Sequence, residues 1–207
     1  DGSIDVVFLG GVGFSRAHAR HGAIPLVMRD IDTRFTSVVV VRSGDPARSL
    51  RDLRGRSFTF GNRDSTSGHF MARYFLGIEG VEPERFFSRI EYSASHDSTL
   101  NAVADGKIDA GAMSGIFAYA AVGPGGARAK DLRMLWETSP YPDYVWAARR
   151  ELPAGLRQRL MDAFLDLDFS TPASKLALER EMADGFLPAE PEDFRLVAEV
   201  LRRADRL

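Results

Sequence analysis

The sequence contains no cysteine, three lysines and no long apolar run. The absence of cysteine excludes disulfides, thiol catalysis and thiolate metal sites, so nothing predicts a metal or another cofactor. A membrane-spanning helix needs about 20 consecutive apolar residues, and no stretch here predicts a transmembrane segment. Of the 27 basic residues, three are lysines and 24 are arginines, which are scattered along the chain.

The balance of charge excludes further classes of function. The net charge is -2 and the isoelectric point is about 6.1, whereas nucleic-acid binding leaves a basic footprint on a domain. We therefore expect no nucleic acid and no acidic membrane face as partners. With 207 residues, of which 44% are hydrophobic, the chain has the material for one large or two small domains. Residues 1–3 show neither the basic segment nor the apolar core of a signal peptide.

Residues 61–68, Gly-Asn-Arg-Asp-Ser-Thr-Ser-Gly, form the segment with the clearest chemistry, and we call them the cradle loop. They lie between a strand expected at 57–60 and a helix expected at 69–76. The first N–H groups of a helix lack partners within it, and the helix dipole is positive at that end. The hydroxyls of Ser65, Thr66 and Ser67 add uncharged donors, so the loop predicts a binding site for a small tetrahedral oxyanion.

A structural interpretation of the same loop is that Ser65 or Ser67 only caps the helix, because serine is favoured at helix N-caps. A capping box would place Glu or Gln three residues after the cap. Here Gly68 follows Ser65 and Phe70 follows Ser67 at that spacing. The loop alone leaves capping and anion binding open.

Strand-like and helix-like segments alternate over most of the chain, with short connections. This pattern predicts an α/β sheet with helices on its faces, and ligands of such sheets gather at the carboxyl ends of the strands. The run Val38-Val39-Val40-Val41 predicts a strand buried on both faces. Strands are expected at 4–9, 36–42, 57–60, 89–92, 108–113, 133–136 and 144–148, and helices at 14–21, 69–76, 98–105 and 154–166, with further helices after residue 170.

Four segments in this order make a family recognisable: residues 5–10, 49–55, 64–68 and 102–110. Together they resemble the phosphate/phosphite/phosphonate-binding family of ABC-transporter substrate-binding proteins. The resemblance continues through residues 139–140 and 185–188 and so covers nearly the whole chain. Its most specific part is the Ser-Thr-Ser-Gly segment that follows a strand.

The resemblance implies an α/β, two-lobed periplasmic-binding-protein-like fold of type II, each lobe a mostly parallel sheet flanked by helices. Lobe 1 is expected to comprise residues 1–38 and 145–207, and lobe 2 residues 39–144, with strands 36–42 and 144–148 as the two crossings. The family has a further strand and helix before the segment that matches residues 4–10. Without that unit, lobe 1 would expose a sheet edge and apolar surface, which favours self-association.

The resemblance also assigns site residues. It maps Ser65, Thr66 and Ser67 onto the oxyanion-binding hydroxyls of the family, and His96 onto a histidine that reaches the same oxyanion. Taken alone, His96 is more often an ordinary residue at a junction between loop and helix. Phe35 takes the position of a pocket aromatic that is usually tyrosine, so one hydroxyl contact is lost. The predicted ligand-binding residues are Ser65, Thr66, Ser67, His96, Phe35, Tyr144 and Asp143.

The class of ligand follows from acidic residues that are absent. Relatives that hold aminoalkylphosphonates use carboxylates for the ammonium group, and residues 110–117 contain none. Asp143 is either a substitute for them or a turn residue after Pro142. We therefore expect phosphate, phosphite or a short alkylphosphonate as the ligand, with no ammonium group. No catalytic residue is predicted. The resemblance implies that the protein acts outside the cytoplasm and that its partner is an ABC-transporter permease.

Two alternatives belong to other classes of protein. Relatives with this fold present an oxyanion to a membrane histidine kinase, and nothing in the sequence separates that sensor role from transport. A hydrolase with Ser65 as nucleophile and His96 as base is the weaker alternative, because no Gly-x-Ser-x-Gly elbow precedes the helix.

Overall fold

The structure is a computed structural model that describes residues 3–204, so residues 1 and 2 of the start considered above lie outside the described part. The chain forms two compact units. Unit 1 combines the residues up to Arg34 with those from Tyr141 onward, and unit 2 is Phe35–Pro140. The chain thus passes between the units at 34/35 and 140/141, whereas the sequence placed these passages at 38/39 and 144/145.

Unit 1 is built on a four-stranded sheet with the strand order β1-β8-β2-β9. All three strand pairings are antiparallel, so the expected mostly parallel sheet is wrong for this unit. The physical reason is that β8 enters from the distant second passage and runs opposite to both of its neighbours. The elements of unit 1 are β1 (Val6–Leu9), α1 (Gly11–His21), β2 (Ile24–Arg29), η1 (Asp30–Arg34), β8 (Val145–Ala148), α6 (Ala154–Leu165), α7 (Pro172–Glu181), β9 (Phe186–Pro188), η4 (Pro191–Phe194) and α8 (Arg195–Ala204).

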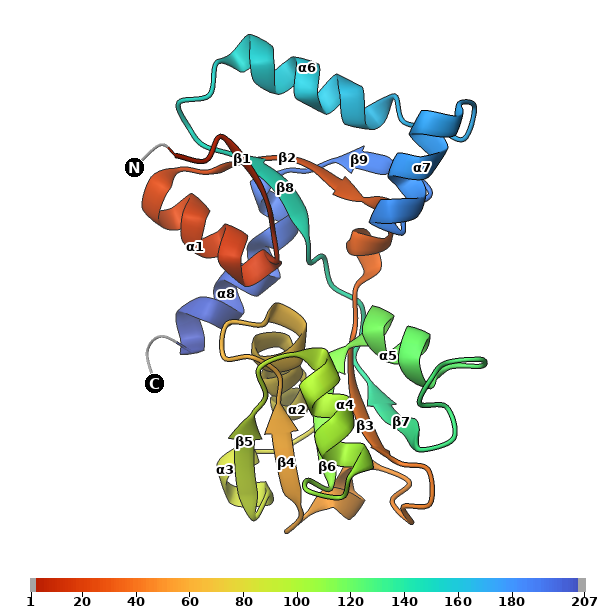
Figure 1. The fold of residues 1–207 in the computed structure, drawn as a ribbon. Coiled ribbons are helices and arrows are strands. Elements are labelled where there is room, and N and C mark those ends of the chain that lie inside the picture. Colours follow the sequence, from red (N-terminus) through yellow and green to blue (C-terminus); the bar gives the residue numbers. More distant parts are fainter. Residues whose placement is uncertain (1–2, 205–207) are drawn as a thin grey trace. The chain divides into compact units, whose positions relative to one another are not determined.

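Helices cover both faces of this sheet (Figure 1). On one face, Phe14 of α1 and Phe194 before α8 pack on Met28 and Val145. On the other face, α6 and α7 supply the apolar cover, with Leu178 against Val27. The core of unit 1 is therefore two apolar layers separated by the sheet.

Unit 2 contains a five-stranded sheet with the order β5-β4-β6-β3-β7. Strand β4 is parallel to β5 and to β6, whereas β3 is antiparallel to β6 and β7. Its elements are β3 (Ser37–Arg42), η2 (Leu50–Leu53), β4 (Ser57–Phe60), the π-helix η3 (Thr66–Met71), α2 (Ala72–Ile78), α3 (Pro83–Phe86), β5 (Arg89–Tyr92), α4 (His96–Ala104), β6 (Ala110–Ser114), α5 (Gly115–Val122) and β7 (Leu132–Glu137).

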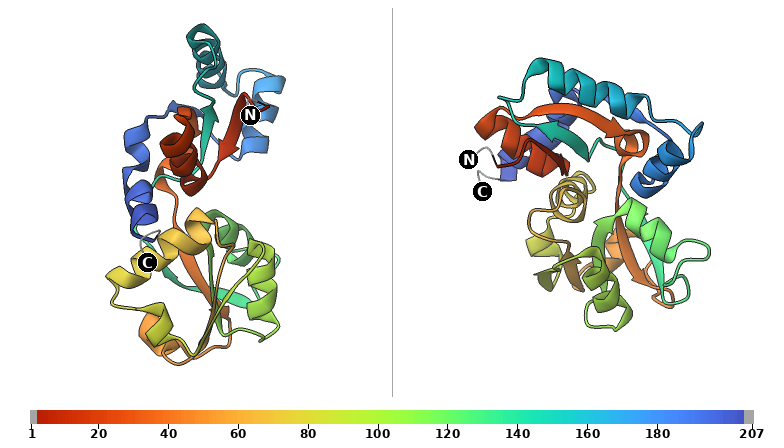
Figure 2. Two further views of the ribbon diagram at one scale, coloured as in Figure 1. Left: turned by 90° about the vertical axis from the view of Figure 1, so that its left-hand side faces the viewer. Right: turned by 45° about the horizontal axis from the view of Figure 1, so that its top comes forward.

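The valine run of β3 explains how unit 2 is layered. Side chains of a strand alternate between its two faces, and Val38, Val39, Val40 and Val41 are all fully buried. Val39 and Val41 pack with Leu76 of α2 in one cluster. Val38 and Val40 pack with residues of α4 and α5 in another, and Figure 2 shows helices on both faces of this sheet. Double burial of this strand, predicted from the sequence, is confirmed.

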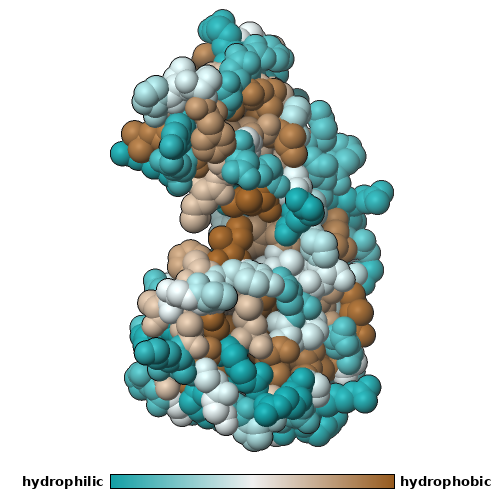
Figure 3. All heavy atoms as spheres, turned by 90° about the vertical axis from the view of Figure 1, so that its right-hand side faces the viewer, coloured by the Kyte–Doolittle hydropathy of each residue, from teal (hydrophilic) through white to brown (hydrophobic). Residues whose placement is uncertain are grey.

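The surface of each unit mixes residue types. On the face shown in Figure 3, hydrophilic residues alternate with small hydrophobic patches in both units. Within residues 3–204, no helix is both long and apolar enough to cross a membrane.

Candidate functional site

The cradle loop connects β4 to η3 in unit 2, as the sequence predicted, and it closes on itself through two glycines. The backbone N–H of Gly61 donates to the carbonyl of Gly68 at 2.8 Å. A methyl group added to Gly68 would lie 3.0 Å from the Cα of Gly61, which is tighter than nine in ten real side-chain contacts. Glycine at both positions permits this approach without a shift of the backbone, so the two glycines hold the hydroxyl residues between them at the end of β4.

Ser65 caps the helix, in agreement with the structural interpretation of that residue. Its Oγ accepts the N–H of Gly68 at 2.9 Å, and its carbonyl accepts the N–H groups of His69 and Phe70. The hydroxyl hydrogen of Ser65 is not consumed by the capping bond, so it stays a candidate donor to an anion. Capping and anion binding are therefore compatible at this residue.

Thr66 and Ser67 form the first turn of η3 and are 5% and 1% exposed. The hydroxyl of Ser37, at the start of β3, donates to the carbonyl of Ser67 at 2.6 Å. This bond fixes the turn against the neighbouring strand. The π-helical geometry of η3 is itself rare and is frequent at functional sites.

His96 is the first residue of α4, the helix that follows β5. Its ring is half-buried and lies 5.1 Å from the ring of Phe117 in α5. Its Nδ1 is buried and has no hydrogen-bond partner in the described part of the chain. Burial lowers the pKa of His96 below its ordinary value, an effect that the nearby Asp97 opposes. Burial thus favours the neutral imidazole, whose Nδ1 is left without a partner among the described residues.

Sheet topology brings these groups to one edge. Strand β4 lies between β5 and β6 and is parallel to both, so the carboxyl ends of the three strands share one edge of the sheet. The cradle loop follows β4, His96 follows β5, and Phe117 follows β6. The N–H of Ser93 donates to the carbonyl of Phe60 at 2.9 Å, which holds the first two connections together. Such an edge is where α/β sheets bind ligands.

The remaining predicted residues are divided between the units. Phe35 begins unit 2 and is 3% exposed. Asp143 and Tyr144 belong to unit 1. Oδ1 of Asp143 accepts the N–H of Gly11 at 2.7 Å, at the start of α1, where a negative charge is stabilising.

Tyr144 lies in an aromatic and cationic cluster of unit 1. Its ring stacks on Phe8 at 5.1 Å, and the guanidinium of Arg29 lies 5.7 Å from its centre. Burial raises the pKa of Tyr144 to about 12. The phenol therefore stays protonated and keeps its capacity to donate a hydrogen bond.

Sequence reasoning missed Ser37 and His69. Ser37 is a polar residue directly before the valine run 38–41, and this contrast was visible in the sequence. His69 holds the cradle loop in place. Its Nδ1 lies 2.7 Å from the carbonyl of Arg63, and its ring contacts the ring of Tyr92 edge-on. No sequence pattern distinguishes such a contact from an exposed histidine.

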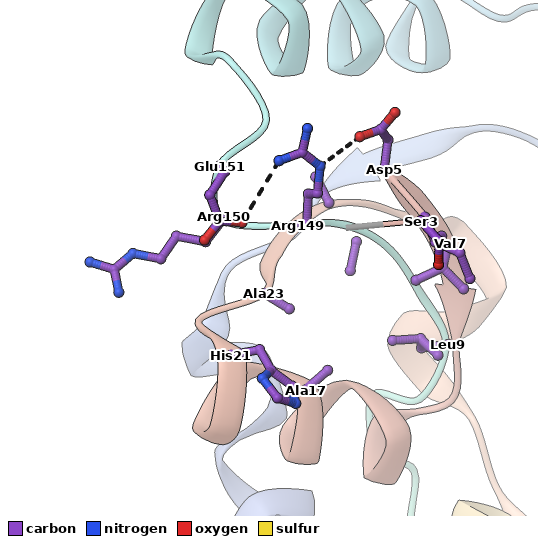
Figure 4. A pocket seen from close by; sticks show the side chains of 13 residues that line it. Ser3, Asp5, Val7, Leu9, Ala17, His21, Ala23, Arg149, Arg150 and Glu151 are labelled. Atoms are coloured by element: carbon purple, nitrogen blue, oxygen red, sulfur yellow. Dashed lines mark hydrogen bonds and ion pairs between the residues drawn. The ribbon is translucent and has the colours of Figure 1, made fainter. Parts of the chain in front are cut away.

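A hollow of about 820 Å³ lies elsewhere, in unit 1 beside β1 and α1 (Figure 4). Its walls include Val7, Leu9 and Ala17, and Arg149 donates to Asp5 at its rim at 2.6 Å. It contains none of the predicted ligand residues. Within residues 3–204, β1 pairs only with β8 and is an edge strand of its sheet. Self-association through this edge stays a prediction.

Comparisons with known proteins identify the family of this chain. The model of the family of ABC-transporter, phosphonate, periplasmic substrate-binding proteins matches residues 1–194. A probable ABC transporter phosphite binding protein, PhnD1 of Prochlorococcus marinus (strain MIT 9301), is 31% identical over 99% of this chain and 73% of that protein. The chain therefore belongs to this family, whose members are substrate-binding proteins.

Solved structures show the same architecture. PhnD1 from Prochlorococcus marinus in complex with methylphosphonate has a TM-score of 0.90 and 31% identity, over 99% of this chain and 79% of that one. A binding-protein component of an ABC phosphonate transporter from Pseudomonas aeruginosa has a TM-score of 0.82 and 19% identity, over 99% and 70%. The predicted class, a type II periplasmic binding fold, is confirmed.

Proposed function

We propose that this chain captures a small phosphorus oxyanion without an ammonium group, namely a phosphonate, phosphite or phosphate. It would deliver this ligand to the permease of an ABC transporter, outside the cytoplasm. The support is the shared edge of β4 and β5, which carries the cradle loop and His96. Family membership and the ligand names of the relatives agree with this proposal.

The unused Nδ1 of His96 is the observation that carries the proposal. A buried polar atom without a partner costs about 1 to 3 kcal/mol. An oxyanion beside it would supply an acceptor and recover that cost. The hydroxyls of Thr66 and Ser67 and the first N–H groups of η3 would bind the other oxygens, since bonds to a charged acceptor are the stronger ones.

Entry to this site requires movement. Thr66 and Ser67 are almost fully buried, so a ligand reaches their hydroxyls only after covering atoms have moved. Opening and closing around a ligand is the usual motion of two-unit binding proteins. Closure on the ligand would also exclude water and so strengthen the charged hydrogen bonds.

The substituent of the oxyanion would be small and apolar or absent. Phe117 lies against His96 and offers an aromatic face. Oδ1 of Asp143 accepts the N–H of Gly11, and residues 110–117, which include β6, contain no carboxylate for an ammonium group. Methylphosphonate and phosphite fit this environment better than aminoethylphosphonate.

Calorimetric titration of four ligands tests the proposal: methylphosphonate, phosphite, phosphate and aminoethylphosphonate. Thr66→Val removes a hydroxyl at nearly constant volume, and we expect it to weaken binding of the preferred oxyanion by about 1 to 3 kcal/mol. Ser88→Ala removes an exposed hydroxyl elsewhere in unit 2 and should leave the affinity unchanged. Equal affinities for wild type and Thr66→Val would refute the assignment.

The hydrolase alternative finds no support in the geometry. No hydrogen bond joins Ser65 to His96 among the described residues, and the oxygen of Ser65 is engaged with Gly68. Incubation with p-nitrophenyl phosphate should therefore give no turnover. Repeated turnover that is lost in Ser65→Ala would contradict a pure binding role.

A further inference from the structure

A second hollow in unit 1, of about 230 Å³, lies between α1 and α8. These helices are neighbours on one face of the sheet (Figure 1). Its apolar lining includes Phe14, Phe194 and Leu201, and the two phenylalanine rings are 4.8 Å apart. None of the predicted oxyanion-binding residues lines it.

Ser15 is the polar residue in this apolar lining. It is 7% exposed, and its Oγ is buried with no hydrogen-bond partner among residues 3–204. A hydroxyl in the middle of a helix commonly bonds to a carbonyl one turn earlier, but here it does not. The oxygen is covered, so a polar group that enters the hollow reaches it only after lining side chains move, and would then supply the missing partner.

The rim of the hollow is positively charged. Arg20 and Arg202 line it and are exposed, and the lining includes no aspartate or glutamate. Arg20 forms no ion pair within the described residues, and Arg202 donates to the carbonyl of Ala198 at 3.3 Å, which leaves its charge uncompensated. An anionic group at the mouth would meet both guanidinium groups, which suit carboxylates well.

We propose that this hollow binds a small aromatic carboxylate that carries a hydroxyl group, of the size of 4-hydroxybenzoate. The ring packs on the apolar lining at Pro191 and Ala198, the carboxylate meets Arg20 and Arg202, and the hydroxyl pairs with Ser15 Oγ once lining side chains move. Pockets for drug-sized ligands span about 300 to 1,000 Å³, so this smaller hollow takes a single ring. The site is separate from the oxyanion site and does not depend on the proposed function.

Titration followed by amide resonances of the 15N-labelled protein tests this proposal with three probes: 4-hydroxybenzoate, benzoate and 4-hydroxybenzyl alcohol. We expect 4-hydroxybenzoate to shift resonances of α1 and α8 and to bind about tenfold more tightly than benzoate, because only it satisfies Ser15. The alcohol, which lacks the carboxylate, should bind more weakly than either.

Variants separate the contributions. Ser15→Ala should abolish the preference for 4-hydroxybenzoate over benzoate while the spectrum of the free protein stays folded. Arg20→Gln should weaken both carboxylates about fivefold, whereas Arg180→Gln, which removes an exposed arginine of α7 in the same unit, should not. Ala198→Leu, which fills the hollow, should abolish binding of both carboxylates.

Clear outcomes overturn the proposal. Either no shifts in α1 and α8 at millimolar 4-hydroxybenzoate, or an unchanged preference in Ser15→Ala, would do so. Titrating methylphosphonate into the same samples keeps the two proposals apart. Failure of methylphosphonate to bind would contradict the oxyanion site without touching this one.

Discussion

The two units differ in how they pair buried ionisable side chains. In unit 1, Arg29 and Asp32 form a bidentate ion pair, and Oδ1 of Asp143 accepts the N–H of Gly11, whereas the buried hydroxyl of Ser15 has no partner among the described residues. In unit 2 the edge beyond β4 and β5 leaves Nδ1 of His96 without a partner. The difference teaches that a buried ionisable group is evidence for a binding site only where its partner is missing and it lies beside other ligand-binding groups, as His96 lies beside the cradle loop.

Strand direction explains why the cradle loop and His96 share one edge of the sheet in unit 2. Three adjacent parallel strands, β5, β4 and β6, end at one edge, and each is followed there by a loop that starts a helix. The antiparallel strands of unit 1 send successive connections to alternate edges. Helix N-termini and hydroxyls are therefore concentrated in one unit and dispersed in the other.

The largest expected effect concerns the buried ion pair between Arg29 and Asp32 in unit 1. Asp32 is fully buried and Arg29 is 6% exposed, so Asp32→Ala leaves a buried cation alone. We expect a loss of about 3 to 5 kcal/mol in the free energy of unfolding of unit 1, measured by urea denaturation. Lys107→Ala removes an exposed ion pair of unit 2 and should not shift the midpoint. A loss in Asp32→Ala no larger than this control's would show that unit 1 does not depend on its internal pairs.

A smaller effect is expected at the glycines of the cradle loop. Gly68→Ala places a methyl group 3.0 Å from the Cα of Gly61 and from Ser65 Oγ, and should cost about 1 to 3 kcal/mol of stability and weaken methylphosphonate binding. Gly77→Ala, in α2, meets nothing within 4 Å and should stabilise the helix by about 0.5 kcal/mol. Urea denaturation of both variants measures the change in stability, and calorimetric titration measures the change in methylphosphonate affinity. Full binding by Gly68→Ala would mean that the loop geometry is not required.

The protonation of His96 tests whether its unpartnered Nδ1 takes part in ligand binding. Because burial lowers its pKa, the imidazole is neutral in the free protein at pH 7, whereas a bound dianion favours the protonated form. We expect proton uptake on binding of methylphosphonate near pH 6.5, measured by calorimetry in buffers of different ionisation enthalpy. His96→Asn should bind without this uptake. Equal uptake in the variant would place the proton elsewhere.

The smallest effect concerns stability and pH. The folded-state pKa values of His69 and His96, both in unit 2, lie below the ordinary value, chiefly through burial. The unfolded chain then takes up protons first, so their contribution is fully present above about pH 6.5 and declines as the pH falls through that value. Urea midpoints at pH 7.5 and 5.5 measure the decline. His69→Gln should reduce it, and an unchanged decline would exclude His69 as a source.

Most of unit 2 could be predicted from the sequence because its signals are local. The valine run predicts β3, and the strand at 57–60 with its loop is found as expected. Strand β2 was not predicted, since Pro25 disfavours a strand. The structure accommodates it where the register between β2 and β8 shifts, at Pro25/Val27.

The candidate site was predictable only where its residues are adjacent in sequence. Ser65, Thr66 and Ser67 form one segment, and the family resemblance supplied His96. The bond from Ser37 to Ser67 joins residues 30 positions apart, and the bond from Gly11 to Asp143 joins residues 132 apart. Such pairs depend on how the chain folds back, which no local pattern records.

Strand β3 is enclosed on both edges and both faces within unit 2. This strand bonds to β6 on one side and β7 on the other, and helices cover both of its faces. Its amide hydrogens can reach solvent only when the whole unit unfolds, so they should exchange with deuterium more slowly than those of β5. Ser37, the first residue of β3, attaches the cradle loop to this slowly exchanging strand through its hydrogen bond to Ser67. The loop would thus travel with a rigid body when a ligand is captured.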